Sequence, residues 1–569
     1  MATLTSNSIA STYTMLLKMD ATGVTSSLQK VEDGDATDSA LSISTIAAAL
    51  DATDKFYFDG GGDTYLHEVS ADKLDIVVGG QTILELAEGG GGASDYAAIQ
   101  ALNKLYLDGG SNTYIHESAA DTIGFATGGS TRMVLDDNSR ISLSNNDSGA
   151  NNTVFGKLAG NALADGGEYN VLLGGNAGLA ITTGDQNIIV GTSAGYAITT
   201  SGSNILIGHG AGNSMSAGQT DTDGTVAIGN AALTALTTGI GNTAIGHEAL
   251  DAAATSDYNT AVGYQSLSAV NGDGDAGNTA IGYQSSLAIT IGKYNTSLGV
   301  QSLKTEDVGN FSTALGYNSM YSQNSDSNNE VTGNTGLGAY TGFYNVTGQN
   351  NTYVGYNSGF GASGQSNGDN TAVGKDALLS VTTGSNNSIL GGLAGDAITT
   401  GNNNCFIGYA AGGASTDVDG AVAIGLYAMR SGNVTSAADG TIAIGQNALD
   451  ALTSGAGNVA VGYESLLTEN AGGGNVALGY RALKTVDNDD GHNIAIGYEA
   501  MVNSANAYYN IAIGRSAGAE MSSANVGSCV LIGYQSGDAI NHADASGTVA
   551  IGKSALTALT SGIGNVAIG

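Results

Sequence analysis

The chain has 569 residues, a formal net charge of −35 and no proline, where average usage predicts about 28. Hydrophobic residues make up 41% of the chain and charged residues only 12%, a balance opposite to that of disordered proteins. The strong negative charge, without any basic cluster, argues against nucleic-acid binding, and no apolar stretch approaches the roughly 20 residues of a membrane-spanning helix. We therefore expect a folded chain with no nucleic-acid partner and no membrane insertion.

The same composition bears on the fold and on the cell compartment. Glycine accounts for 89 residues, a share that suits a tight turn in every structural unit. Proline cannot donate to a strand ladder, so its absence favours long, uninterrupted strand pairing. Residues 1–17 carry neither a basic residue nor a sustained apolar run, unlike a secretory signal. We expect synthesis and assembly inside a cell.

The first 140 residues lack the repeat that dominates the rest of the chain. Residues 1–50 contain an acidic, turn-rich segment and are expected to form a separate N-terminal region. Residues 51–140 hold a tandem duplication with an offset of 49, in which Lys55–Glu68 aligns with Lys104–Glu117. Alternating apolar residues followed by Asp-Gly-Gly predict a β-hairpin in each copy, and so two small β modules.

From residue 152 onward, the phrase Asn-Thr-Ala-Ile-Gly and its variants recur 24 times, and 14 of the 23 intervals are 17 residues long. The other intervals are 18 to 22 residues, so the unit accepts insertions but no deletions. A fixed period with insertions at certain points is typical of stacked coils, which predicts an all-β fold with a β-solenoid shaft over residues 141–569. At about 4.8 Å per coil, the shaft would be on the order of 110 Å long. We expect a positive φ or close coil contact at the glycine that closes each phrase, among them Gly246, Gly263, Gly282, Gly299 and Gly316.

Side-chain volume is exchanged between two positions of the repeat. With the Asn of each phrase as position 0 and the closing glycine as position 4, a large residue at position 2 is accompanied by glycine at position 8, as in Leu206/Gly212 and Phe406/Gly412. When position 2 is Ala or Ser, position 8 is Leu or Met, as in Ala244/Leu250. Constant summed volume is what a close-packed site demands, so we infer that the two positions meet across a turn or between neighbouring chains. Three pairs depart from the rule: Ala280/Ser286, Gly336/Gly342 and Ala512/Gly518.

Positions 1 and 3 carry β-branched and aliphatic residues and would occupy the opposite face of each strand. A strand with both faces apolar predicts a solenoid that also packs against a partner. Identical copies of the chain are the most economical partner.

Several segments resemble known fibres. The phrase Asn-Thr-Ala-Ile-Gly-Tyr-Gln-Ser at residues 278–285 is similar to repeats in bacteriophage tail-fibre proteins, particularly marine ones, and to the β-roll heads of trimeric autotransporter adhesins. Residues 13–19 and 35–44 resemble tail-fibre amino termini, and the Tyr-Ile-His-Glu module at 114–117 is similar to parts of the same proteins. The resemblance implies a homotrimeric fibre, fixed to the virion by residues 1–50, with host recognition at the distal end. The coil is longer than that of the adhesin roll, and the last phrase ends at Gly569 within a coil, so we expect further chain beyond it.

Candidate metal sites are few. His67 and His116 occupy equivalent places in the two β modules, so three chains could present a ring of imidazoles to zinc or iron. We favour the alternative that each histidine is an ordinary polar strand residue. The Asp/Asn/Gly-rich insertions at 221–224, 271–275, 417–420 and 487–491 suggest Ca²⁺, but residues 271–282 lack the glutamate that closes an EF-hand loop. Solvated turns explain these insertions better, and we expect no cofactor.

The remaining candidates also have structural explanations. Asp489 and Asp490 could assist glycan cleavage, yet adjacent acidic residues are commonplace, so we expect no enzyme. Cys405 and Cys529 lie in apolar surroundings and are expected to be buried free thiols. Tyrosine follows many of the closing glycines, which indicates either a stripe that binds sugars or, as we prefer, a ladder of stacked rings: Tyr264, Tyr283, Tyr317, Tyr356, Tyr463, Tyr480, Tyr498 and Tyr534.

The sequence thus predicts a structural fibre of a phage tail or capsid, assembled in the host cytoplasm and located on the virion. Its partners would be further copies of the chain, other tail, baseplate or capsid proteins, and a glycan or protein on the host surface. A bacterial adhesin of the trimeric autotransporter type is the first alternative. A tailspike that degrades polysaccharide is the second.

Overall fold

The structure is a computed structural model that describes residues 151–215, 222–522 and 525–569 throughout. Between residues 18 and 143 it describes the strands given below and the turn residues 58, 62–64, 79–80, 107, 112–113 and 128–129. The chain divides into two units, Met1–Asn146 and Asp147–Gly569. The Gly-rich residues 89–92 and most of residues 1–50 lie outside the described part.

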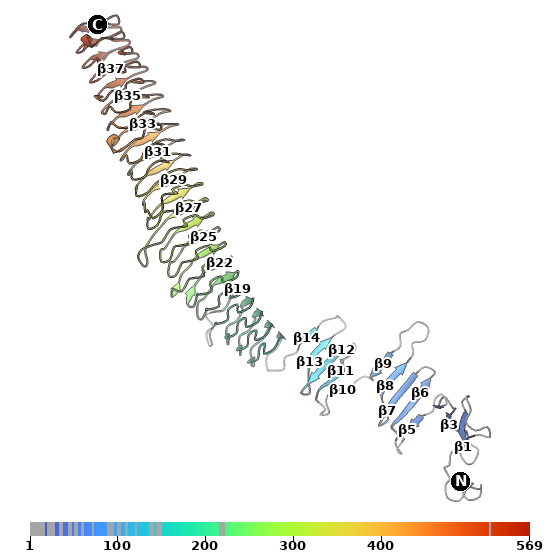
Figure 1. Ribbon diagram of the computed structural model, residues 1–569. Coiled ribbons are helices and arrows are strands. Elements are labelled where there is room, and N and C mark those ends of the chain that lie inside the picture. The colour runs from blue at the N-terminus through green and yellow to red at the C-terminus, as the bar shows by residue number, and fades with distance from the viewer. Residues whose placement is uncertain are drawn as a thin grey trace, which may run out of the picture. The chain divides into compact units, whose positions relative to one another are not determined.

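The first unit contains three antiparallel sheets, each formed by strands that are consecutive in the chain (Figure 1). The sheet nearest the N-terminus has four strands and the other two have five. The four are β1 (Lys18–Met19), β2 (Gln29–Glu32), β3 (Asp38–Ile43) and β4 (Ala48–Leu50). The second sheet contains β5 (Lys55–Tyr57), β6 (Tyr65–Ser70), β7 (Lys73–Val78), β8 (Gln81–Ala87) and β9 (Tyr96–Ile99). The third contains β10 (Lys104–Tyr106), β11 (Tyr114–Ala119), β12 (Thr122–Thr127), β13 (Ser130–Leu135) and β14 (Ile141–Leu143).

The two five-stranded sheets have the same topology, and their first four strands pair in the same register. Lys55 of β5 pairs with His67 of β6, and Lys104 of β10 pairs with His116 of β11, so the duplicated segments form the two predicted hairpins. In both sheets the lysine ammonium lies over a tyrosine of the partner strand, 3.9 Å from the ring centroid of Tyr65 and 3.8 Å in the second copy. A cation held over an aromatic ring stabilises the hairpin beyond its backbone hydrogen bonds.

The second unit is the predicted β-solenoid, whose 24 phrases each form one three-residue strand of a single parallel sheet (Figure 1). Neighbouring strands pair in register, so positions 1, 2 and 3 of the repeat each form a row along the shaft. The strands are β15 (Thr153–Phe155), β16 (Val171–Leu173), β17 (Ile188–Val190), β18 (Ile205–Ile207), β19 (Val226–Ile228), β20 (Thr243–Ile245), β22 (Thr260–Val262), β24 (Thr279–Ile281), β25 (Thr296–Leu298), β26 (Thr313–Leu315), β27 (Thr335–Leu337), β28 (Thr352–Val354), β29 (Thr371–Val373), β30 (Ser388–Leu390), β31 (Cys405–Ile407), β32 (Val422–Ile424), β33 (Ile442–Ile444), β34 (Val459–Val461), β35 (Val476–Leu478), β36 (Ile494–Ile496), β37 (Ile511–Ile513), β38 (Val530–Ile532), β39 (Val549–Ile551) and β40 (Val566–Ile568).

Insertions between coils form a few additional elements. These are β21 (Ser256–Asp257), which pairs with β23 (Gly274–Asp275), and the 3₁₀ turns η2 (Ser436–Ala438) and η3 (Ala543–Ala545). Two acidic residues of these insertions, Asp223 and Asp419, stand at position −2 of the coil and make the same contact. There, a carboxylate accepts the backbone N–H of position −2 in the preceding coil, as from Gly202 to Asp223, at 2.8 Å, and from Asn402 to Asp419, at 2.6 Å. Part of the first acidic insertion, residue 221, lies outside the described residues.

The closing glycines are required by close contact between neighbouring coils. A Cβ atom built on Gly246 would lie 2.2 Å from the carbonyl oxygen of Gly263, and the same contact recurs along the shaft, with 2.3 Å at Gly316. The φ angles are +139° at both glycines, a region that other residues rarely adopt. The two predicted reasons for glycine at this position, a positive φ and close contact between coils, are therefore both confirmed.

The Asn at position 0 forms an amide ladder inside the shaft. Asn187 donates its side-chain Nδ2 to Oδ1 of Asn170, at 3.0 Å, and Asn204 donates in the same way to Asn187. The same Oδ1 accepts the backbone N–H of the next Asn, also at 3.0 Å. These side chains are fully buried, so the ladder satisfies polar groups that would otherwise be costly to bury.

Positions 2 and 8 meet within one chain. A Cβ atom on Gly212 would lie 3.0 Å from a methyl carbon of Leu206, and one on Gly412 would lie 2.3 Å from the ring of Phe406. In coils of the other type, Ala244 and Leu250 are both fully buried in the core. The contact also reaches the next coil, which accounts for two departures from the rule: Tyr353 fills the space at Gly342, and Leu531 fills the space at Gly518. In the third, Ser286 hydrogen-bonds to Ser297 of the next coil.

Candidate interaction face

The outer side of the 24-stranded sheet is uncharged along the whole shaft. Position 2 points inward and is buried in every strand except the terminal β15 and β40, whereas positions 1 and 3 are partly or fully exposed in all 24. Position 1 is always Thr, Val, Ile, Ser or Cys, and position 3 is always Ile, Leu, Val or Phe. We call these two rows the outer face. The single chain leaves uncovered the face that the sequence predicted to pack against a partner.

Aromatic residues flank this face in part of the shaft: position 5 is often tyrosine, and position −1 is aromatic in five coils, at Tyr169, Tyr258, Tyr294, Phe311 and Tyr509. The row at position 5 was foreseen in the tyrosines after the closing glycines, but the row at position −1 was missed. All large apolar residues that the described shaft exposes belong to positions −1, 1, 3 and 5, except Leu158, Tyr196, Val331 and Ile563. Large apolar residues exposed at the same positions of many coils are unusual in a soluble monomer, which indicates a surface that contacts a partner.

The row at position −1 follows a pattern that the sequence does contain. Tyr258 and Tyr294 each cover a glycine at position −1 of the preceding coil; a Cβ atom on Gly241 would lie 2.8 Å from the ring of Tyr258. Tyr294 stacks on Phe311 of the next coil, with ring centroids 5.3 Å apart. The alternation of glycine and an aromatic residue one place before the Asn is therefore the signal that would have revealed this row.

The row at position 5 forms stacked ladders. Tyr463, Tyr480 and Tyr498 stack face to face on consecutive coils, with centroids 5.3 and 5.0 Å apart. Arg515 continues the column on the next coil, its guanidinium 5.3 Å from the ring centroid of Tyr498 and 5.9 Å from that of Tyr534. The predicted tyrosine ladder is therefore present in these coils, where stacking covers the ring faces and leaves the ring edges to solvent.

The two histidines considered for metal binding lie at equivalent places in separate sheets. Tyr65 contacts His67 edge-on, at 6.0 Å between ring centroids, and Tyr114 contacts His116 at 5.1 Å. Among the described residues of one chain, no group of three or more His, Cys, Asp or Glu side chains could hold a metal ion. The proposed ring of imidazoles would need three chains and stays a prediction.

The other polar candidates are placed as follows. Carboxylates of the acidic insertions accept backbone N–H groups, as described above for Asp223 and Asp419. Asp489 and Asp490 are exposed. Cys405, partly exposed, and Cys529, buried, are both free thiols, and burial raises the pKa of the Cys529 thiol.

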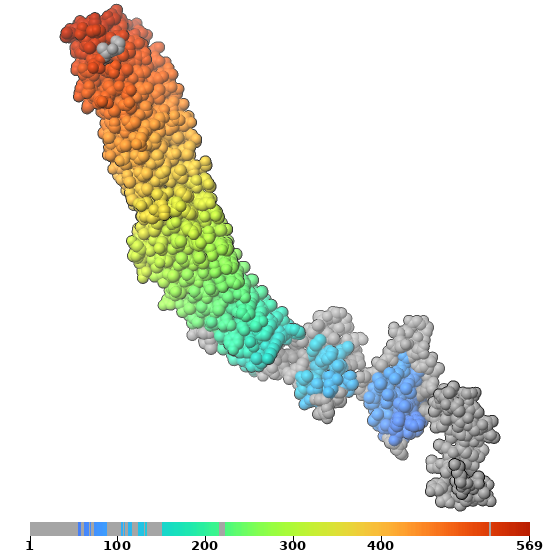
Figure 2. All heavy atoms as spheres, viewed as in Figure 1, coloured from blue at the N-terminus to red at the C-terminus, as the bar shows by residue number. Residues whose placement is uncertain are grey.

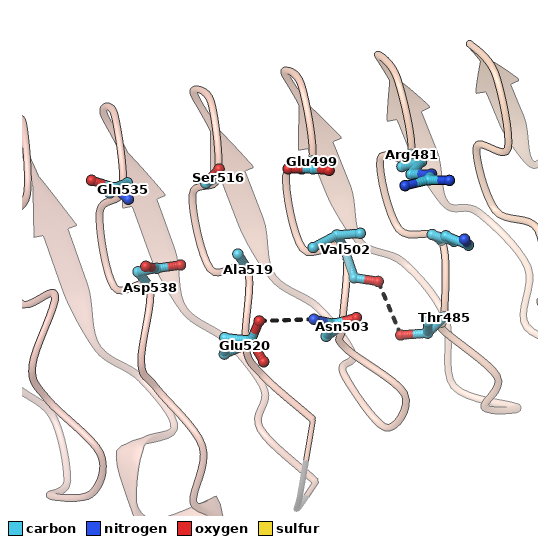
Figure 3. Close-up of a pocket in the computed structure, with 11 residues that line it drawn as sticks. Arg481, Thr485, Glu499, Val502, Asn503, Ser516, Ala519, Glu520, Gln535 and Asp538 are labelled. Carbon is cyan, nitrogen blue, oxygen red and sulfur yellow. Dashed lines mark hydrogen bonds between the residues drawn. The ribbon is translucent and has the colours of Figure 1, made fainter.

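A polar groove of about 430 Å³ crosses the coils of β35 to β38 (Figure 3). Its two cations are held at one end, where Arg481 and Lys484 each lie 2.8 Å from the carboxylate of Glu464. Burial raises the pKa of Glu464, but hydrogen bonds from Lys484, Tyr463 and Arg481 outweigh it and lower that pKa to about 2.

The other end of the groove is acidic. Glu499, Glu520 and Asp538 line it on successive coils, and Asn503 donates a hydrogen bond of 2.8 Å to Glu520 (Figure 3). Burial, and secondarily the charge of Glu520, raises the pKa of Asp538.

Comparisons with protein families, with curated proteins and with solved structures find no match for this chain. In the part of the chain that the structure describes, no helix has the length and apolar character needed to cross a membrane. The functional inference therefore depends on the solenoid itself, an architecture that fits a fibrous structural protein or an adhesin.

Proposed function

We propose that this chain is the shaft of a non-enzymatic viral fibre, fixed to a phage tail or capsid through residues 1–50 and presenting a host-binding surface distally. The observation that carries the proposal is the stack of 24 in-register coils, which converts a short repeat into an elongated rod (Figure 2). The net charge of −35 keeps such rods apart except where an uncharged surface allows contact. The resemblance of the repeated phrase and of the N-terminal segments to phage tail fibres supports this assignment.

The outer face supports self-association into a homotrimer. It lacks charge, carries an aliphatic residue or Phe at position 3 of every coil and repeats with every coil, so an identical rod in the same register offers a matching surface at each step. Three rods would each cover the outer face of a neighbour and leave the loops and acidic insertions in solvent. Burying this surface provides the hydrophobic stabilisation that a long, thin single chain lacks.

Sedimentation equilibrium of the intact chain tests the assembly. We expect a mass three times the 56.3 kDa of one chain. Lysine at two paired outer-face positions, Val262→Lys with Ile281→Lys, should dissociate or weaken the trimer, because each charge would be desolvated in the interface. Asn271→Lys, on an exposed insertion, is the matched control and should leave the mass unchanged. A monomer at all concentrations would refute the assembly.

A separate experiment is needed to test whether the fibre is attached to a virion and by which end. Electron microscopy of particles labelled at residue 1 should show the label at the particle surface, with the shaft pointing outward. Label at the free end would reverse the anchoring direction, and a fibre found on bacterial cells without virions would favour the adhesin. Release of oligosaccharides from host capsule by the purified chain would instead establish the polysaccharide-degrading tailspike.

A further inference from the structure

Aromatic side chains gather at one place on the shaft, in the turns that follow strands β26, β27 and β28. Seven of the 34 aromatic residues of the chain lie on the surface of this short stretch, residues 317–360, the yellow-green part of the shaft in Figure 2. We call them the aromatic cluster. Its members are Tyr317, Tyr321, Tyr340, Phe343, Tyr344, Tyr356 and Phe360.

The cluster is built differently from the ladders elsewhere. The coil of β27 has Ala339 at position 5, so Tyr317 and Tyr356, one coil to either side, lack a stacking partner there. Tyr340 stands edge-on between them instead, with ring centroids 5.2 and 6.1 Å away, and also contacts Phe343 at 5.6 Å. Perpendicular rings leave parts of their faces uncovered, and Tyr317 and Tyr356 are 47% and 49% exposed.

The interior is polar in the consecutive coils of β25, β26 and β27, two of which carry the cluster; elsewhere position 11 is a buried polar residue only in separate coils, at Ser415, Glu469 and Ser504. Position 11 is apolar in most coils, as at Ile181 and Met215, but in three consecutive coils it is Glu306, Gln323 and Asn345, all buried. The apolar core is correspondingly divided into two clusters, one ending at Met320 and the next beginning at Tyr353.

These buried groups are joined by hydrogen bonds. Gln323 donates its amide to Oε2 of Glu306, at 2.8 Å, and Asn334 donates to Gln323 at 3.1 Å. Asn318, beside Tyr317, is buried, and its Oδ1 has no hydrogen-bond donor in the described structure. Polar groups inside and aromatic rings outside contradict the pattern that stabilises the other coils. Such local contradictions are expected where function rather than stability selects the residues.

We propose that the aromatic cluster binds a neutral sugar of a host-surface glycan, an inference that rests on the proposed fibre function and assigns its recognition surface to the middle of the shaft. Exposed tyrosine faces match the C–H faces of a pyranose ring, while phenol hydroxyls and amides match its hydroxyl groups. The seven side chains themselves carry no charge; the ammonium of Lys304 lies 5.3 Å from the ring centroid of Tyr321, and Lys375, next to Tyr356's coil, forms an ion pair with Asp376.

A second copy of the chain does not fit the cluster. Contacts between identical rods would repeat with every coil, as the outer face does, whereas the cluster occurs once among 24 coils. Only Tyr317 and Tyr356 stand in the flanking row at position 5; the other members occupy positions 6, 9 and 10, outside the strand rows 1 and 3 and the flanking row. Its occurrence at one level of a periodic rod is what a discrete ligand requires.

An array of defined neutral and acidic oligosaccharides, probed with the intact chain, tests the proposal. We expect binding to at least one neutral oligosaccharide. The chain contains no tryptophan, so its tyrosine fluorescence can then follow titration with that sugar. The double variant Tyr317→Ser with Tyr356→Ser should bind about tenfold more weakly or worse, as expected when aromatic anchors are truncated.

The matched control is Tyr283→Ser with Tyr498→Ser, at the same position of ladder coils and with nearly the same exposure, 46% and 45%. Its affinity should stay within about twofold of the unchanged chain, since a change below 0.5 kcal/mol is usual for such surface positions. Binding of acidic sugars only, no binding to any neutral sugar, or equal loss in both double variants would overturn the proposal. Sedimentation equilibrium of the same proteins distinguishes a loss of sugar binding from a loss of trimer assembly. The variant Tyr317→Ser with Tyr356→Ser should assemble like the unchanged chain.

Discussion

Two stretches of the shaft fill the same core in opposite ways. The coils of β15 to β18 place a large residue on the strand and glycine on the turn, as in Leu206/Gly212, whereas the coils of β32 to β36 place alanine on the strand and Leu or Met on the turn, as in Ala443/Leu449. The turn residue has a left-handed backbone in both, with φ of +58° at Gly212 and +51° at Leu449. The backbone is therefore fixed by the stacking of coils, and the side chains adapt to it. Leucine tolerates a strained φ because its side chain fills the core.

The largest expected effect comes from the backbone that both stretches share. Gly316→Ala should destabilise the shaft by about 4 kcal/mol or more, the sum of a strained φ and overpacking against the next coil. The added Cβ would lie 2.3 Å from the carbonyl oxygen of Gly338. Urea unfolding monitored by circular dichroism measures the loss. Gly420→Ala, at a φ of +64° but with open space around it, should cost about 1 kcal/mol. Equal losses would show that inter-coil contact is unimportant.

Exchanging the large and the small side chain between positions 2 and 8 of one coil tests the comparison directly. Leu250→Gly should destabilise by about 2–4 kcal/mol through a cavity, and Ala244→Leu by about 1–3 kcal/mol through overpacking. The double variant should recover more than half of the summed loss, because the new leucine occupies the vacated volume. A double-mutant cycle from thermal unfolding gives the coupling. Simple additivity would mean that the two positions do not share one space.

One coil carries a buried glutamate at a core position that is apolar in most coils, and this should make the stability of the shaft depend on pH. Glu469 occupies the apolar position 11 and is fully buried; burial raises its pKa from 4.5 to about 7, although backbone N–H donors of Gly472 and Ala471 oppose this. A raised carboxyl pKa means that this group favours folding below pH 4.5 and that the stability falls as the pH rises to 7. Glu469→Gln should therefore stabilise the shaft by about 3 kcal/mol at pH 8 and change little at pH 4.

Glu464 is the control, because its pKa is lowered to about 2 and the pH dependence of its contribution to stability should have the opposite sign. Its contribution is present above pH 4.5 and is lost as the pH falls to 2, so Glu464→Gln should destabilise the shaft at pH 8. Urea midpoints of both variants across this pH range give the two curves. Curves of the same sign would contradict the assigned environments.

The smallest expected effect concerns the caps at position −2. Asp419→Ala removes the acceptor for the backbone N–H of Asn402 and should cost about 1–2 kcal/mol, the value of a hydrogen bond to a partly exposed charged group. Hydrogen exchange at Asn402 should accelerate accordingly. Asp490→Ala, on an exposed insertion, should lie within about 0.5 kcal/mol of the unchanged chain. Unchanged exchange at Asn402 would show that the cap adds nothing.

Much of this architecture could be predicted from residue spacing. The repeat period predicted the solenoid, and the volume exchange of Leu206/Gly212 predicted the core contact. The row at position −1 was missed because an aromatic residue next to a turn has no meaning until its glycine partner on the preceding coil is known, as with Tyr258 and Gly241. The polar interior at Glu306 was missed because one glutamate in a turn resembles an exposed residue.

Local sequence by itself determined the coil, because glycine, asparagine and β-branched residues at fixed spacing each have one favourable place in a stacked strand and turn. Only the tertiary structure decided which rows are covered and which are open. Side chains 17 or more residues apart become neighbours through stacking, and their contacts depend on the coils above and below. The exposed outer face, the stacking of Arg515 between two tyrosines and the aromatic cluster are all products of that third dimension.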